Sequence, residues 1–176
     1  MSISSGAHLS YYRSCHGRWA GELRFSITDV AAFRAAPISW LDRERVWSMA
    51  LTSQLLGFVW MQTSVDCDVL GEGRVLHTTR LSRFGIPMLI GREVLLPRED
   101  GRSAAMHLEQ RLSPTYANHR WDDGEVVVND DVSGAVYDLP WIGGRMRQVA
   151  RVVPDGLVLA QETPFSHGEV VLHRQR

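Results

Sequence analysis

The chain has 176 residues, a formal net charge of −1 and hydrophobic residues at 44% of its positions. A chain of this length forms a single domain that buries about two thirds of its unfolded surface. The balanced charge gives no electrostatic basis for binding nucleic acid or an anionic membrane. Every residue of the Lys and Arg class is arginine, so covalent catalysis through a lysine Schiff base is excluded.

Cysteine content and apolar runs set further limits. Cys15 and Cys67 are the two cysteines, which is too few for a disulfide framework or a thiolate zinc site. We identify no signal peptide and no apolar run near the roughly 20 residues of a membrane span. We therefore expect a soluble cytoplasmic protein with no membrane partner, no metal and no cofactor.

The first third of the chain combines one strand with helical segments. Residues 7–14 favour a short helix. From Arg18 the apolar pattern has a period of two, typical of a half-buried strand that ends at Ile27. Two helices are then expected, over 29–34 and about 40–55, with Gly57 ending the second.

Beyond Gly57 the pattern is one of short strands and turns. Pairs such as Asp100-Gly101 and Gly143-Gly144 supply the positive φ angles of tight hairpins. About ten strands joined in this way form an up-and-down meander that closes and removes exposed edges. We predict an all-β fold, a single antiparallel barrel over 1–176 with a helical insert at 29–55. The expected strands after the insert are 58–68, 74–83, 86–96, 103–112, 116–121, 125–129, 133–139, 145–153, 157–163 and 169–175, with a further turn at Asp123-Gly124.

Three residues carry a resemblance to a known superfamily. Gly17 and Trp19 open the first strand as Gly-x-Trp, and Arg174 lies near the end of the last strand. In this the chain resembles the calycins, which include lipocalins and fatty-acid-binding proteins. The resemblance implies that Arg174 packs over Trp19, that the barrel holds a small molecule and that the insert is a lid over one mouth.

A second resemblance concerns haem. The motif Gly17-x-Trp19-x-Gly21 resembles that of the nitrobindin group of haem-binding barrels, and His167 is near the place of their axial histidine. This implies a haem barrel as a further alternative, with His167 or His77 as ligand.

Strand alternation predicts which polar side chains face the barrel interior. On each strand we take the face with more apolar residues as internal. An internal arginine needs an acid, a polar ligand or water, because an unpaired buried charge is very costly. Apolar walls with a few convergent polar groups are typical of a small-molecule site. A filled core with an internally paired polar network is the alternative. The polar residues placed inside are His77, Arg92, Gln110, Tyr137, Gln148 and Gln161.

These residues lead to a functional hypothesis. The expected partner is a hydrophobic small molecule, on which the protein acts as a cofactor-free isomerase or cyclase. His77 is the expected proton shuttle, Tyr137 a donor and Arg92 the stabiliser of a developing oxyanion. The expected ligand-binding residues are Trp47, Trp60, Gln110, Gln148 and Gln161.

Two further functional alternatives and the oligomeric state stay open at this stage. One is a carrier without chemistry, in which the same residues hold a carboxylate or carbonyl group. Another is a catalytic cluster of Glu93, Glu109 and Arg111 on the opposite strand face, which by the default interpretation carries surface ion pairs. The sequence also does not decide between a monomer and a homodimer.

Overall fold

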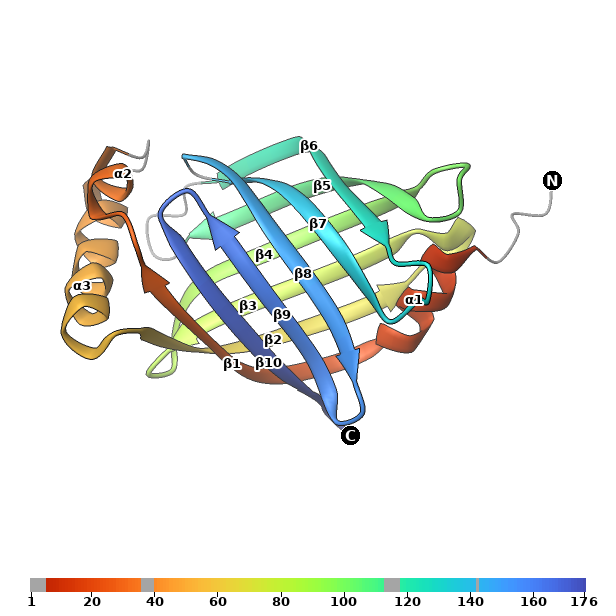
Figure 1. The fold of residues 1–176 in the computed structure, drawn as a ribbon, viewed down its shortest axis with the longest axis horizontal. Coiled ribbons are helices and arrows are strands. Elements are labelled where there is room, and N and C mark those ends of the chain that lie inside the picture. The colour runs from red at the N-terminus through yellow and green to blue at the C-terminus, as the bar shows by residue number, and fades with distance from the viewer. Residues whose placement is uncertain (1–5, 36–39, 113–117, 142) are drawn as a thin grey trace.

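Ten antiparallel strands form one closed barrel in the computed structural model, which describes residues 6–35, 40–112, 118–141 and 143–176 (Figure 1). The strand order around the barrel is β1-β10-β9-β8-β7-β6-β5-β4-β3-β2. The predicted all-β, up-and-down antiparallel barrel with a small helical insert is therefore confirmed. The strands are β1 (Gly17–Ile27), β2 (Val59–Val69), β3 (Val75–Arg83), β4 (Ile86–Pro97), β5 (Ser103–Leu112), β6 (Asn118–Val128), β7 (Gly134–Trp141), β8 (Gly144–Val153), β9 (Gly156–Thr163) and β10 (Ser166–Arg174).

Helices occupy the two ends of the barrel. The helix α1 (Ala7–Cys15) lies at one end, and α2 (Val30–Ala35) and α3 (Trp40–Leu56) lie at the other (Figure 1). A 3₁₀ turn, η1 (Gly71–Gly73), joins β2 to β3. None of the described helices has the length and apolarity needed to cross a membrane.

Inward-facing and outward-facing side chains alternate along β1 as its sequence predicts. Trp19 and Leu23 are buried toward the barrel interior, whereas Glu22 and Arg24 are exposed. A tight turn at Phe84 and Gly85, both with positive φ, joins β3 to β4. Turns of this handedness match the twist of the strands that they connect, so the chain returns directly as the neighbouring strand.

The predicted turn at Asp123-Gly124 is wrong. These residues lie inside β6, which joins the two segments expected over 116–121 and 125–129 into one strand. The register with β5 shifts here, since Met106 pairs with Gly124 and Leu108 with Trp121. Asp-Gly thus forms a β-bulge instead of a hairpin, because the partner strand continues past it.

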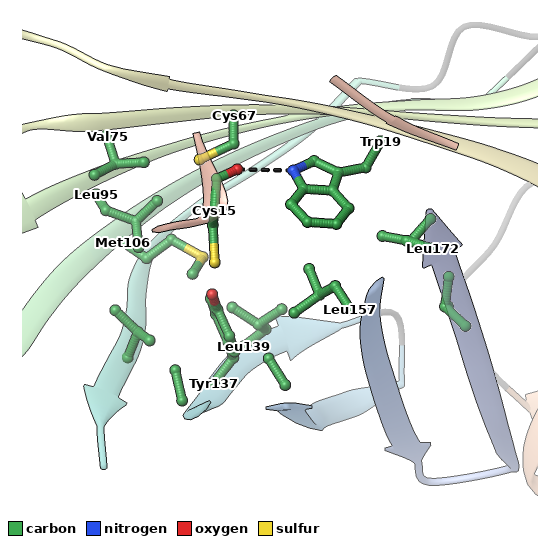
Figure 2. Close-up of a cluster of buried hydrophobic side chains, with 14 of the residues drawn as sticks. Cys15, Trp19, Cys67, Val75, Leu95, Met106, Tyr137, Leu139, Leu157 and Leu172 are labelled. Atoms are coloured by element: carbon green, nitrogen blue, oxygen red, sulfur yellow. Dashed lines mark hydrogen bonds between the residues drawn. The ribbon is translucent and has the colours of Figure 1, made fainter. Parts of the chain in front are cut away.

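The first and last strands and α1 are joined at Trp19. The Trp19 Nε1 group donates a hydrogen bond to the Cys15 carbonyl oxygen at 2.7 Å (Figure 2). Trp19 is also paired in register with Arg174, whose guanidinium carbon lies 4.7 Å from the centroid of its ring. The predicted packing of Arg174 over Trp19 is therefore confirmed.

Candidate functional site

The barrel encloses a cavity of about 250 Å³. Its walls are mostly apolar and include Leu23, Met61, Leu81, Leu159 and Val170. From the helices at the two ends, Tyr12 on α1 and Phe33 and Met49 on α2 and α3 also line it. The helical insert thus borders the cavity at the end opposite α1.

Polar side chains gather at the α1 end. His77 on β3 pairs in register with Cys67 on β2 and with Glu93 on β4, so the three side chains form one row across neighbouring strands. All three line the cavity. The His77 Nδ1 atom lies 3.3 Å from Glu93 Oε2, and the two side chains are only 11% and 17% exposed.

The Cys67–His77–Glu93 row determines the charge of the histidine. Burial by itself would lower the pKa of His77, but its interactions with Cys67 and Glu93 outweigh burial and raise that pKa above the ordinary value of 6.5. His77 is therefore protonated at neutral pH and forms an ion pair with Glu93 inside the barrel.

Two tyrosine hydroxyls complete the polar end. The Tyr12 hydroxyl donates to the Tyr137 hydroxyl at 2.8 Å, and the Tyr12 ring lies 5.3 Å from the His77 ring, measured between centroids. Burial raises the pKa of both phenols well above 10.0, so both stay neutral donors. The Tyr137 hydroxyl also interacts with the hydroxyl of Tyr11, so the three phenols form one hydrogen-bonded group of neutral donors at this end.

The structure places the three glutamines where alternation predicts. Gln110, Gln148 and Gln161 all line the cavity, and Gln148 pairs in register with both Tyr137 and Gln161. The buried Gln110 Oε1 atom has no hydrogen-bond partner among the described residues. A buried acceptor in this state is satisfied by a donor on a bound molecule or by water.

The placement of Arg92 inside the barrel is wrong. Arg92 is exposed, while its neighbours Gly91 and Glu93 line the cavity. The register of β3 with β4 shifts between Leu81 and Ser82, where Leu81 pairs with Leu89 and Ser82 with Pro87. Met88 is thus an extra residue, and the inner face alternates from Leu89 onward. Ile90 is apolar but lies on the outer face of β4, where it is 42% exposed. It adds to the apolar count of the face that carries Arg92, so a count of apolar residues selects the wrong face as internal.

Of the two tryptophans proposed as ligand contacts, the structure describes the side chain of Trp60. Trp60 is on the outer face of β2, between the buried Val59 and the cavity-lining Met61, and the centroid of its ring lies 5.9 Å from that of Phe84. The expectation for Trp60 is wrong because the inner face of β2 is the one with Met61 and Thr63. The Trp47 side chain lies outside the described part of the structure.

The alternative sites predicted at the Glu93, Glu109 and Arg111 cluster and at His167 do not form as expected. Glu93 faces the cavity, whereas Glu109 is on the outer wall within 3.5 Å of Arg120, so the cluster of Glu93, Glu109 and Arg111 does not form. His167 is exposed and turned away from the cavity, while the preceding Ser166 lines it. The geometry therefore does not support His167 as an axial haem ligand.

Sequence reasoning missed the contribution of α1 and of Cys67. His8, Tyr11, Tyr12 and Cys15 follow helical spacing and are all buried, a stripe that indicates a helix packed on one face. Cys67 continues the inner alternation of Met61, Thr63 and Val65 on β2. Both signals were present in the sequence, but the register that pairs Cys67 with His77 was not.

Comparison with known proteins supports the fold. No protein-family model and no curated protein matches the sequence. The structure is similar to the crystal structure of Rv2717c from M. tuberculosis, with a TM-score of 0.60 and 15% sequence identity over 96% of this chain and 98% of that chain. At this identity the likeness shows a shared fold.

Proposed function

We propose that the protein encloses a largely hydrophobic small molecule in its barrel and acts on it as a cofactor-free isomerase or cyclase. The observation that carries this proposal is the His77–Glu93 ion pair at one end of an otherwise apolar cavity. An ion pair that is withdrawn from water is costly to maintain, and perturbed titratable groups in a cavity are typical of catalytic sites.

In the proposed reaction His77 is the general acid. Protonated at neutral pH, it transfers a proton to an alkene or carbonyl group of the enclosed molecule, and Glu93 stabilises the charge of the ring before transfer. The Tyr137 hydroxyl donates to an oxygen of the ligand on which negative charge develops. A proton lost from another carbon of the ligand returns to His77, so isomerisation or ring closure needs no cofactor.

The barrel architecture agrees with this proposal. Calycins hold apolar ligands inside antiparallel barrels, and we propose that this chain is calycin-like in the same sense. The insert formed by α2 and α3 would cover the mouth, where the Phe33 and Phe165 rings meet edge to face at 5.2 Å between centroids. A ligand could then enter when this contact opens.

A non-catalytic carrier is the second candidate. The observation that favours it is that the polar groups at the α1 end already pair with one another, Tyr12 with Tyr137 and His77 with Glu93. Such pairing satisfies buried polar groups without a reaction. In this case the cavity would hold a carbonyl or carboxyl compound unchanged.

Extraction of the bound compound tests the two candidates. The wild-type protein and His77→Gln are purified identically, and their ligands are analysed by chromatography and mass spectrometry. For an isomerase or ring-closing cyclase, the variant retains a compound of the same mass but a different retention time. The same compound in both proteins supports the carrier and contradicts the enzyme.

Cavity occupancy is tested with an apolar fluorescent probe, N-phenylnaphthylamine. Leu159→Trp fills the cavity from β9 and is expected to abolish probe binding, while the matched change Ala160→Trp, next to it on the exposed face, is expected to preserve it. Equal binding by both variants would place the probe outside the barrel and contradict the proposal.

A further inference from the structure

Cys67 has a position that the acid–base proposal does not use. On the inner wall it pairs in register with His77, on the side of that histidine opposite to Glu93. The order thiol, imidazole, carboxylate is the one in which a nucleophile, its proton acceptor and an orienting acid occur in cysteine-dependent enzymes. Cys67 also lines the cavity and is 2% exposed, so a reagent must enter the barrel to reach it.

Cys15 provides an internal comparison within the same cavity. It also lines the cavity and is 4% exposed, but its neighbours are Ser14, Tyr11 and Cys67. Burial, followed by the nearby Cys67, raises the pKa of the Cys15 thiol to about 11. A buried thiol whose pKa is raised in this way is chemically inert. Figure 2 shows both cysteines in the buried cluster with Tyr137.

We propose that Cys67 is a covalent nucleophile for an α,β-unsaturated carbonyl compound with an apolar body, held in the barrel. This proposal rests on the proposed function and specifies its substrate class. His77 holds the thiol proton, Glu93 orients His77, and the Tyr137 hydroxyl donates to the carbonyl oxygen. The apolar walls accommodate the remainder of the molecule.

The reaction is a reversible addition that isomerises a double bond. The Cys67 sulfur forms a bond to the β carbon, and the electron pair of the carbon–carbon double bond moves so that the carbonyl oxygen becomes an enolate. The bond between the α and β carbons is then single and rotates. When the enolate reforms the carbonyl, the sulfur leaves with its electron pair and the opposite geometric isomer is released. No atom is gained or lost and no oxidant or reductant is needed.

Dimethyl maleate is a suitable probe because addition and elimination of a thiol convert it to dimethyl fumarate. The intact protein is incubated with this diester, fumarate is followed by NMR, and adducts are mapped by mass spectrometry. We expect adducts to form on Cys67 about tenfold faster than on Cys15. Cys67→Ser is expected to abolish fumarate formation.

His77→Gln separates a positioned nucleophile from a merely accessible one. It is expected to slow the Cys67 adduct about tenfold while the slow reaction of Cys15 stays unchanged. Arg92→Met, a change on the exposed outer wall, is the control that is expected to match the wild type in every measurement.

The outcomes are distinguishable. Equal rates at the two cysteines, or a Cys67 rate that His77→Gln leaves unchanged, would overturn the covalent role of Cys67. If N-phenylnaphthylamine still binds in the barrel under those conditions, the small-molecule function stands and only the covalent step is wrong. If the probe does not bind the wild type, the proposed function itself fails.

Discussion

At the residue scale, one step along β4 separates a site residue from a surface residue. Glu93 faces the cavity and pairs with His77, whereas Arg92 points outward. Polarity alone does not distinguish them, since arginine and glutamate are both strongly polar residues and lie in the same strand. The extra residue Met88 sets the alternation and decides which of the two enters the barrel.

Glu93→Gln is expected to lower the pKa of His77 and the free energy of unfolding. Loss of one partner of a buried ion pair costs about 3 kcal/mol. Because the folded-state pKa of His77 is raised, its contribution is complete below the ordinary value of 6.5 and is lost as the pH rises through the folded-state value. Urea unfolding over a pH series should therefore show a difference that shrinks at alkaline pH.

A matched change on the outer wall is the control for that experiment. Glu109→Gln removes a carboxylate on the outer wall that forms an ion pair with the exposed Arg120, so its effect should stay below about 1 kcal/mol. A loss for Glu93→Gln that is the same at every pH would contradict the assigned ion pair.

Arg92→Met is expected to change neither stability nor probe binding. Substitutions at exposed sites without special contacts usually stay within about 0.5 kcal/mol, and Arg92 is exposed. The measurements are urea unfolding and N-phenylnaphthylamine titration. Loss of probe binding in this variant would indicate that Arg92 lines the cavity and would contradict the alternation described for β4.

At the element scale, α1 is more than an N-terminal extension, because it forms one end of the cavity. Tyr12 reaches Tyr137 on β7, and the Cys15 carbonyl receives the Trp19 indole hydrogen bond. Arg174 of β10 adds a hydrogen bond to the Ser14 carbonyl oxygen and covers the Trp19 ring. The first and last strands together therefore hold α1 in place.

Arg174→Ala is expected to destabilise the protein by about 1 kcal/mol, the usual contribution of a cation–π contact at an exposed site. A double-mutant cycle with Trp19→Phe measures the coupling by urea unfolding. Arg176→Ala is the control, since Arg176 is exposed beyond the end of β10. Additive effects of Arg174→Ala and Trp19→Phe would show that the two side chains do not interact.

At the scale of the whole molecule, the barrel is closed where β1 meets β10. Gly21 of β1 pairs in register with Leu172. A Cβ atom at position 21 would lie 1.8 Å from the Val171 carbonyl oxygen. The backbones of β1 and β10 thus approach too closely for any side chain at position 21. This explains why the second glycine of Gly17-x-Trp19-x-Gly21 is needed there.

Gly21→Ala is expected to cost about 3 kcal/mol or more, because the clash is with backbone that cannot move without opening the barrel. Gly71→Ala is the matched control: a Cβ there meets nothing within 4 Å, so its effect should be within about 1 kcal/mol. Thermal and urea unfolding measure both. A Gly21→Ala protein as stable as the wild type would refute the close approach of β1 and β10.

The sequence by itself determined the barrel and the helical insert, and the resemblance to calycins implied the contact of Trp19 with Arg174. The barrel and the insert depend on signals within a strand or a turn, such as the alternation around Leu23 and the turn glycines. It also placed His77, Tyr137 and the three glutamines inside, because on those strands one face is clearly more apolar than the other.

Only the tertiary structure decided the composition of the polar end. On β4 both faces carry apolar residues, so alternation does not predict whether Arg92 or Glu93 faces the cavity. The β-bulge at Met88 determines that Glu93 does. The Cys67–His77–Glu93 row arises from the register of three strands, and Tyr12 joins it from a helix 125 residues away from Tyr137 in sequence. Contacts of this kind depend on how the closed barrel aligns its strands, which no local pattern in the chain encodes.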